Sequence, residues 1–412
     1  MKKYVLVGAG GRGTFSYAKP LIDELSDCTE LCGIYDINPK RAAVCSKKTG
    51  KDIPVFDDFD KMLETVKPDG VIVTSMDCTH DEYIIKALDY GCDVVTEKPM
   101  TTDGDKCRAI WDAMQRTGKN VTVTFNCRFF PYFVHIKEKI AEGLLGEIYS
   151  VHYEWMLDTV HGADYFRRWH RERKNSGSLL IHKCTHHFDI MNWLIGQNPV
   201  KVNCFGTRRF YGNTAMKKSE RCLTCKERCP YYFDITASSL DRELYYECED
   251  ADGYFRDKCI FSEEIDIEDT LALNVKYDGG AVMSYSLNAH SPYEGNRIII
   301  NGEKGRLVAE DIGGSIGPFY GNNRSRYLKF YNRQEDEVVF NMSDRIFDKP
   351  GGHGGSDPLM RANIFRGFDS DPLGQMADFK AGAMSIGIGI AANISMKEDR
   401  AVYLDEFLDF LK

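Results

Sequence analysis

Three histidines and a lysine lie within six consecutive positions of the segment SLLIHKCTHHFDIMNWL, residues 178–194. If this segment is one helix, His182 and His186 are four residues apart and share a face, while Lys183 and His187 form a neighbouring pair. Imidazole groups change charge near neutral pH and can take up or release protons during a reaction. A lone histidine is more often a satisfied core group, but this density of basic groups indicates proton-transfer chemistry.

A second candidate for chemistry is Lys98, in the segment DVVTEKPM. The apolar residues before it predict a buried strand, so Glu97, Lys98 and Pro99 follow at the carboxyl end of that strand. Ligands of open α/β sheets bind at this edge, where a lysine would lie beside a nicotinamide ring. The alternative interpretation is a solvated loop lysine.

The N-terminal elements that would position these groups are typical of a dinucleotide-binding unit. The sequence KKYVLVGAGGRGTFSYAKPLIDEL predicts a strand, the turn Gly8-x-Gly10-x-x-Gly13 and a helix, and TELCGIYDI predicts a second strand ending at Asp36. Glycines allow a tight turn, the helix N-terminus holds pyrophosphate, and the carboxylate binds ribose hydroxyls. Asp36 favours NAD over NADP, whereas Arg41 nearby leaves the opposite preference open.

Length and charge narrow the class of protein. The chain has 412 residues, which favours two domains, and its net charge of −9 with no Lys/Arg-rich block argues against nucleic-acid binding. The N-terminal apolar run stops after Ala9, too soon for a secretion signal, and the glycine-rich apolar stretch 381–396 is too short to span a bilayer. We therefore expect a cytoplasmic protein that binds neither nucleic acid nor membrane.

These motifs, together with VTSMDCTH and GSLLIHKCTHHFD, resemble the glucose–fructose oxidoreductase, inositol dehydrogenase and rhizopine-catabolism family (Gfo/Idh/MocA). The resemblance covers nearly the whole chain and implies an α/β protein. It implies an N-terminal Rossmann domain with a doubly wound parallel sheet, residues 1–125, and a C-terminal α/β domain with a large, mostly antiparallel open sheet, residues 126–412. The predicted cofactor-binding residues are Gly8, Gly10, Arg12, Gly13, Asp36, Arg41, Ser75, His80, Glu97, Lys98 and Asn126.

The pattern of the second domain agrees with an antiparallel sheet that has one covered face. Apolar and polar residues alternate between turn signals in the segments 147–157, 200–212, 270–290, 296–311 and 327–340. In the family, the sheet covers the nicotinamide and often makes subunit contacts, so the resemblance implies a homodimer or homotetramer.

The resemblance also assigns roles within the histidine segment. His186 matches the family's catalytic histidine, the general base, Lys98 matches the lysine that touches the reacting hydroxyl, and Asp189 matches a second aspartate. His182, however, stands where the family has an aspartate, so the usual relay is not intact. This imidazole could be a second catalytic acid/base, a substrate contact, or half of a metal-binding pair with His186.

A loop with interleaved aromatic and basic residues, HGADYFRRWHRERKNSG, suits a sugar substrate. Sugar rings stack on aromatic faces, and their hydroxyls need hydrogen-bond donors. The alternative is a charged surface loop with its aromatics packed beneath, and the glycine-rich segment PGGHGGSDPLMRANIF is a candidate cap of the pocket. The predicted substrate-binding residues are Tyr165, Arg168, Trp169, Lys183, His187 and His353.

A Cys-rich insertion at about residues 215–262 contains Cys222-x-x-Cys225-x-x-x-Cys229. Three clustered thiols in a reducing compartment are more often metal ligands than structural thiols. We expect Cys259, rather than Cys248, to complete a structural zinc site, with an iron–sulfur cluster or no metal as the alternatives.

Together these features predict an NAD-dependent dehydrogenase that oxidises a secondary ring hydroxyl, with C3 as a candidate, of a sugar, cyclitol or glycoside. The alternative enzyme is an NAD-dependent glycosidase. In that route oxidation at C3 acidifies the C2 proton, a base removes it, the aglycone leaves, and water addition and reduction restore the sugar without net NADH. His182 or His187 would supply the additional base. A non-catalytic NAD-binding sensor is disfavoured, because a sensor needs neither Lys98 nor His186.

Overall fold

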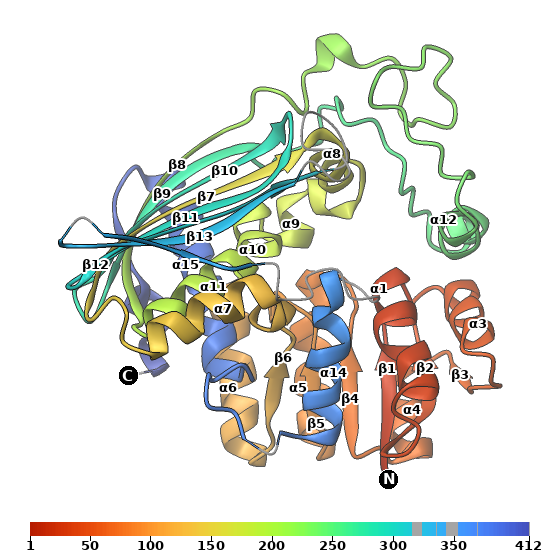
Figure 1. Ribbon diagram of the computed structural model, residues 1–412. Coiled ribbons are helices and arrows are strands. Elements are labelled where there is room, and N and C mark those ends of the chain that lie inside the picture. The colour runs from red at the N-terminus through yellow and green to blue at the C-terminus, as the bar shows by residue number, and fades with distance from the viewer. Residues whose placement is uncertain (315–323, 335, 343–352, 369, 412) are drawn as a thin grey trace.

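The computed structural model describes residues 1–314, 324–334, 336–342, 353–368 and 370–411. The chain forms two sheets, each associated with its own helices, and an excursion that reaches from the second sheet back over the first (Figure 1). The predicted α/β class, with a parallel sheet followed by a mostly antiparallel one, is confirmed.

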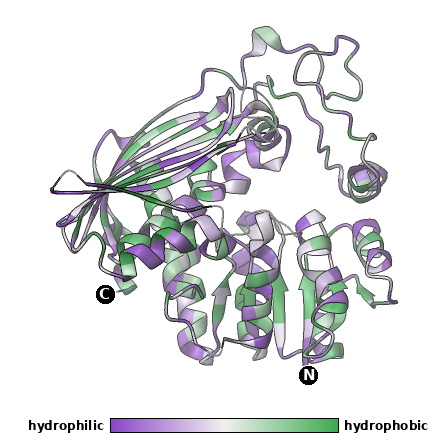
Figure 2. Ribbon diagram, in the orientation of Figure 1, coloured by the Kyte–Doolittle hydropathy of each residue, from purple (hydrophilic) through white to green (hydrophobic). Residues whose placement is uncertain are grey.

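The first sheet is parallel and has the strand order β3-β2-β1-β4-β5-β6. Its strands are apolar and buried on both faces, as all four residues of β4 show, and Figure 2 draws them mainly as hydrophobic. The strands are β1 (Lys2–Val7), β2 (Thr29–Tyr35), β3 (Val55–Phe56), β4 (Gly70–Val73), β5 (Asp93–Thr96) and β6 (Val121–Val123).

Side chains cap the start of three helices in this domain, α3, α4 and α6. Asn38, Asp58 and Asp103 each accept a hydrogen bond from a backbone N–H of the first turn that follows. The helices are α1 (Gly11–Gly13), continued through a π-helical turn (Thr14–Ala18) into α2 (Lys19–Asp23), then α3 (Pro39–Lys48), α4 (Phe59–Val66), α5 (His80–Tyr90) and α6 (Gly104–Thr117).

The second sheet has nine strands in the order β14-β13-β12-β11-β7-β10-β9-β8-β15, and only β7 and β10 pair in parallel among its described strands. Burial alternates along β9 and β10, so one face is covered and the other is open. The strands are β7 (Ile148–Asp158), β8 (Pro199–Thr207), β9 (Thr270–Tyr277), β10 (Val282–Ser291), β11 (Glu294–Gly302), β12 (Gly305–Gly313), β13 (Ser325–Asn332), β14 (Glu337–Phe340) and β15 (Val402–Tyr403).

Helices cover the face of this sheet that is turned toward the first domain (Figure 1). They are α7 (Pro131–Ala141), α8 (Thr159–Arg167), α9 (Arg173–Ser176), α10 (Leu179–His182), α11 (Cys184–Ile195) and α15 (Phe379–Glu398). By length and composition α15 could cross a membrane, and it is longer than the apolar stretch 381–396. However, 67% of its most apolar window is buried within the protein, as expected for a core helix.

Helix α14 (Ser356–Arg366) returns from the C-terminal half of the chain to the first domain (Figure 1). The ring of Phe365 packs edge-on against Tyr4, with centroids 5.1 Å apart, and Arg361 forms an ion pair with Glu24 at 2.8 Å. The boundary at residues 125/126 stays a prediction, but the first domain includes this later helix in its packing.

The Cys-rich insertion connects β8 to β9 and contains α12 (Ser239–Leu244) and α13 (Glu249–Asp252). We call residues 239–256 the arm, because they extend to the first domain and place α12 beside α3 (Figure 1). At the base of the arm, Arg221 forms ion pairs with Glu249 and with the buried Asp257, both at 2.6 Å. These ion pairs stabilise the segment together with buried apolar side chains such as Ile235, Leu244 and Phe261.

Candidate active site

The carboxyl end of β5 meets a break between α10 and α11. The Nζ atom of Lys98 donates a hydrogen bond to the carbonyl oxygen of His182, at 2.9 Å. In a continuous helix that oxygen would accept the N–H of His186, which instead bonds to the carbonyl of Lys183 at 3.3 Å. The prediction of one helix over residues 178–194 is therefore wrong, because the lysine side chain takes the carbonyl that would continue it.

His182 is paired with a carboxylate that the sequence analysis missed. Its Nδ1 atom lies 2.6 Å from Oδ2 of Asp77, a buried residue just after β4. Burial, and then the nearby His170 and Lys98, lower the pKa of His182 far below its usual value, and burial raises the pKa of Asp77. Burial therefore disfavours the charged form of both groups in this pair.

Lys98 has a pKa suited to proton transfer. Burial lowers the pKa of its amine from 10.5 to about 8, although Asp77 and Glu97 oppose the shift. A group with a pKa near the working pH can both accept and release a proton. This property distinguishes Lys98 from a solvated loop lysine.

The other two histidines of the segment have different surroundings. His186 is 8% exposed, and its ring lies edge-on to Phe125 with centroids 6.0 Å apart. His187 is more deeply buried, stacks on Trp155 at 4.1 Å and places Nδ1 at 2.7 Å from the hydroxyl of Tyr285. His187 thus packs α11 against β7 and β10, and its contact with a substrate stays a prediction.

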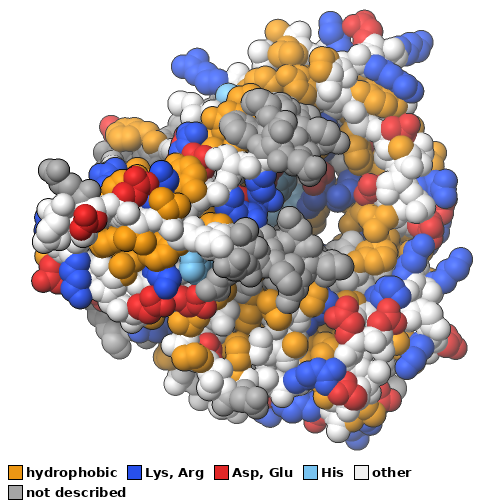
Figure 3. Space-filling model, in the orientation of Figure 1, with side chains coloured by type: hydrophobic (Ala, Val, Ile, Leu, Met, Phe, Trp, Pro, Cys, Tyr) orange, Lys and Arg blue, Asp and Glu red, His pale blue; other side chains and the backbone are white. Residues whose placement is uncertain are grey.

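The predicted substrate residues Tyr165, Trp169 and Lys183 gather around His182. The rings of Tyr165 and Trp169 lie 5.5 and 5.6 Å from the His182 ring. The ammonium of Lys183 lies 5.2 Å above the ring of Trp155. Figure 3 shows this face of the molecule hollowed between the second domain and the arm, with Lys and Arg side chains around the hollow.

Arg168 is held within this cluster by two partners. It forms an ion pair with Asp164 at 2.5 Å and lies 3.2 Å from Nε2 of His170. His170, which belongs to the loop predicted to suit a sugar, in turn lies 4.0 Å from His182, centroid to centroid. The side chain of His353, the remaining predicted contact, lies outside the described residues.

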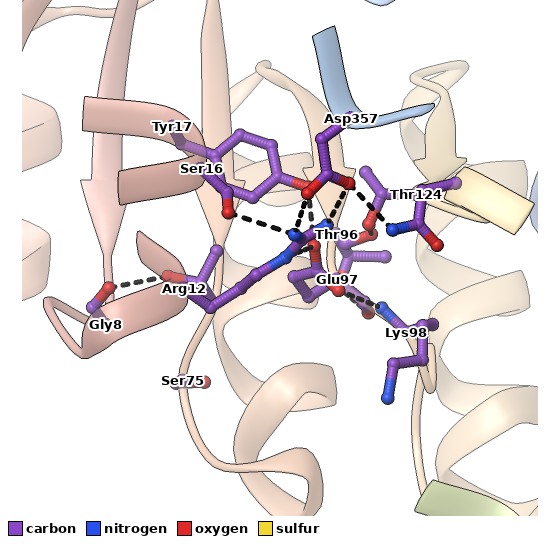
Figure 4. Close-up of polar contacts among 12 residues, drawn as sticks. Gly8, Arg12, Ser16, Tyr17, Ser75, Thr96, Glu97, Lys98, Thr124 and Asp357 are labelled. Atoms are coloured by element: carbon purple, nitrogen blue, oxygen red, sulfur yellow. Dashed lines mark hydrogen bonds and ion pairs between the residues drawn. The ribbon is translucent and has the colours of Figure 1, made fainter. Parts of the chain in front are cut away.

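Arg12, predicted to bind cofactor, lies in a buried polar network (Figure 4). Its guanidinium bridges Glu97 at 2.6 Å and Asp357 at 2.7 Å. The hydroxyl of Tyr17 donates to Glu97, and the amide of Asn126 donates to Asp357, each at 2.7 Å. Arg12, Glu97 and Asn126 thus join the glycine turn, the strand that ends at Lys98, and α14.

Ser75 and His80 connect the ends of β4 and β5. The ring nitrogens of the buried His80 lie 2.8 Å from the carbonyl oxygen of Pro99 and 3.1 Å from that of Ser75. The Ser75 hydroxyl accepts a hydrogen bond from Thr79 at 2.9 Å. His80 therefore fixes the loop beside Lys98.

The N-terminal turn fits a dinucleotide. A Cβ atom on Gly13 would lie 2.0 Å from the carbonyl oxygen of Gly8, so only glycine permits this close approach. Asp36 accepts the N–H of Ala9 at 2.6 Å, which places its carboxylate at the turn, and Arg41 lies 3.2 Å from it. These residues would hold the pyrophosphate and the ribose of NAD, and NAD would supply hydride transfer.

The predicted zinc site is not formed. No group of three or more His, Cys, Asp or Glu side chains among the described residues is arranged to hold a metal, and the cysteines are free thiols. The residues concerned are Cys222, Cys225, Cys229 and Cys259, and the rejected alternative Cys248 is buried apart. The contacts that the described residues of the insertion do make include the ion pairs of Arg221 with Glu249 and Asp257. Since no such group of three is found among the described residues, His182 and His186 have no third protein ligand there for a metal.

Two family models match the chain. The NAD-binding Rossmann fold of the Gfo/Idh/MocA oxidoreductase family matches residues 2–125, and its C-terminal alpha/beta domain matches residues 137–404. This chain belongs to that family. The family is named for NAD binding and oxidoreductase chemistry, in agreement with the turn and with the two sheets.

Among the relatives, the protein YteT of Bacillus subtilis (strain 168), named as an oxidoreductase, is 40% identical over 431 residues, covering 98% of both chains. The D-glucoside 3-dehydrogenase of Escherichia coli (strain K12) is 35% identical over 120 residues, 29% of this chain and 34% of that protein. The solved WlbA dehydrogenase of Bordetella pertussis, in complex with NADH and UDP-GlcNAcA, has a TM-score of 0.66 at 19% identity. That match covers 97% of this chain and 98% of that one, and it bears on the fold alone.

Two residues of the site, Asp77 and Tyr17, were missed by the sequence analysis, and so was the pairing of Asp357 with Arg12. Asp77 had a readable signal, because it is an acidic residue a few positions beyond a buried strand, at the same sheet edge as Lys98. Asp357 had no such signal, because its partner is 345 residues away in the chain.

Proposed function

We propose that this protein catalyses the NAD-dependent oxidation of a secondary ring hydroxyl of a sugar, cyclitol or glycoside. The observation that carries the proposal is Lys98. Its amine has a pKa of about 8 and is fixed at the break between α10 and α11, at the sheet edge where the dinucleotide turn also lies. A lysine with only a structural role would not need to bond to the His182 carbonyl, which a continuous helix would use for its own hydrogen bond.

In this proposal Lys98 and His186 handle the proton of the reacting hydroxyl. NAD, held by the N-terminal turn, would supply the hydride acceptor. The neutral amine of Lys98 accepts the hydroxyl proton, and His186 acts as the general base that passes it on. Asp77, held by His182 at 2.6 Å, raises the pKa of Lys98 against the effect of burial, so it helps to set the pKa of the amine.

The substrate class is supported by two independent features. Tyr165 and Trp169 offer ring faces beside His182, and Arg168 and Lys183 offer donors, which suits a polyhydroxylated ring. The E. coli relative is named as a D-glucoside 3-dehydrogenase, which makes C3 of a glycoside the first position to test.

The test combines the protein, NAD⁺ and a chromogenic aryl glycoside in one cuvette, and follows near-ultraviolet NADH absorbance and aglycone release together. NADH accumulation without aglycone release is the expected result. Lys98→Met and His186→Asn are expected to abolish turnover and to retain NADH binding, which fluorescence measures. If these variants also lose NADH binding, the roles assigned to the two residues are wrong.

The redox-neutral glycosidase is a second candidate, and the Asp77–His182 pair favours it. That route needs a further base near the reacting ring to remove the C2 proton, and His182 lies 4.0 Å from a second buried imidazole. Aglycone release that depends on NAD⁺ while NADH stays flat would replace the dehydrogenase proposal with this one.

We further propose a homodimer or homotetramer located in the cytoplasm. The outer face of the nine-stranded sheet leaves Phe205 65% and Val282 49% exposed. Apolar side chains on an open sheet face are suited to contact with a second copy.

A further inference from the structure

The arm binds to the part of the first domain that surrounds the dinucleotide turn. The contacts come from four different residues of the turn and of the start of α3 with its N-cap, and their partners all lie between residues 244 and 252. The contacts are Gly11 N–H to Tyr245 Oη at 2.8 Å, Asn38 to the Cys248 carbonyl at 2.9 Å, Arg41 to the Leu244 carbonyl at 3.1 Å, Arg41 to Asp252 at 2.8 Å, and Lys40 to Asp250 at 2.5 Å. The arm is therefore a second wall of this site.

Tyr245 reaches the glycine turn itself. Its hydroxyl oxygen accepts the N–H of Gly11, and a Cβ on Gly10 or Gly11 would lie only 3.4 or 3.3 Å from it. Backbone N–H groups of such a turn are the donors that a pyrophosphate uses. The arm thus places an oxygen where the phosphate chain of a dinucleotide runs, which means that its neighbours are close to the adenosine half.

The partners of Arg41 bear on whether the site accepts NAD or NADP. A free arginine near Asp36 would accommodate the 2′-phosphate of NADP. Here the guanidinium is only 9% exposed and lies between two carboxylates, Asp36 at 3.2 Å and Asp252 at 2.8 Å. Burial alone would lower the pKa of Arg41, but Asp36 and Asp252 raise it above its usual value.

We propose that Asp252, from the arm, is a specificity-determining residue that excludes the 2′-phosphate and so selects NAD over NADP. Asp252 occupies the guanidinium face that a phosphate would need, and with Asp36 it gives the site one more negative than positive charge. A 2′-phosphate dianion would have to displace Asp252 and would then face two carboxylates. The inference rests on the proposed NAD-dependent function and adds a determinant about 216 positions beyond the strand where such residues are usually sought.

The chain offers a matched control two residues away. Asp250 also forms an ion pair with α3, through Lys40, but both side chains are more than half exposed, at 51% and 71%. Asp252→Asn and Asp250→Asn therefore remove the same charge from the same arm, and only the first frees Arg41. Asp252→Glu retains the carboxylate and serves as the rescue variant.

The experiment measures dissociation constants for NADH and for NADPH, by fluorescence titration without substrate, in the wild type and the three variants. We expect the wild type to prefer NADH, and Asp252→Asn to shift the NADPH/NADH affinity ratio toward NADPH by about tenfold, as expected for one charge-assisted hydrogen bond. Asp250→Asn and Asp252→Glu should keep the wild-type ratio.

Each other outcome overturns the inference in a recognisable way. An unchanged ratio in Asp252→Asn, or an equal shift in Asp250→Asn, refutes the role of Asp252 and leaves the proposed function intact. A wild type that binds NADPH more tightly refutes the selection of NAD. A wild type that binds neither dinucleotide refutes the proposed function together with the inference.

Discussion

Replacing Lys98 with methionine should make the protein more stable while it abolishes turnover. Burial lowers the pKa of Lys98 from 10.5 to about 8, a difference of about 2.5 pH units. At ~1.4 kcal/mol for each unit, the protonated amine costs the folded state about 3 kcal/mol at pH 7. The lost hydrogen bond to His182 offsets about 1 kcal/mol. We expect Lys98→Met to raise the free energy of unfolding at pH 7 by about 2 kcal/mol.

The sign of the pH dependence follows from the same shift. Because the pKa of Lys98 is lower in the folded chain, the unfolded chain binds more protons between pH 8 and pH 10.5. The free energy of unfolding of the wild type should therefore rise across this window by about 3 kcal/mol relative to Lys98→Met. The variant should lose its advantage by the upper end of the window.

Urea denaturation at pH 7 and above pH 10 measures both quantities, and Lys137 provides the control. Burial, with repulsion from Arg128, also lowers the pKa of Lys137 to about 8, but its amine binds the Trp193 carbonyl away from the dinucleotide turn. Lys137→Met should gain similar stability and keep turnover. A Lys98→Met protein that is less stable at pH 7, or whose stability follows the wild type through the window, would refute the buried-amine argument.

Three further predictions concern the Asp77–His182 pair, the ion pair between Arg128 and Asp189, and the oligomeric state. Asp77→Asn should lower kcat about 100-fold with NADH binding unchanged, and adding His182→Asn should cost little more, because the two act as a unit; additive losses would argue for separate roles. Asp189→Ala leaves the guanidinium of Arg128, bound at 2.7 Å, without its carboxylate, and urea denaturation should show a loss of about 3–5 kcal/mol. Sedimentation should give a dimer or tetramer, and a monomer would contradict the proposed use of the open sheet face.

The fold was predictable because its signals are local and periodic. Each signal reflects only the surroundings of the segment that carries it. Examples are the turn from Gly8 to Gly13, the apolar run of β4, and the alternating burial along β9 and β10. These signals do not depend on contacts with distant parts of the chain. The same independence explains why Asp36 and Lys98 could be placed at the ends of their strands.

Contacts between distant segments could not be predicted. The break at Lys183 depends on a lysine 84 residues away from the carbonyl that it takes, and the sequence around Lys183 reads as helix throughout. The prediction of a zinc site in the Cys-rich insertion failed for a related reason. The spacing of cysteines can suggest a metal site, but whether the four thiols lie close together depends on how the chain folds between them. Among the described residues they form no such group, and Arg221 instead forms ion pairs with Glu249 and Asp257.

The histidine at position 182 is best explained by a change in which segment supplies the carboxylate of the site. The family resemblance implies an aspartate at this position, and the chain instead has an imidazole there with the carboxylate of Asp77 at 2.6 Å. The helix still faces Lys98 through the His182 carbonyl, so the change moves the acid from the helix to the loop after β4 and adds an imidazole between them. In its new place the carboxylate of Asp77 still acts on Lys98, where it and Glu97 raise the pKa of the amine against the larger effect of burial. The low pKa of Lys98, on which the proposed proton transfer depends, therefore comes from burial of the amine and is not a result of this change.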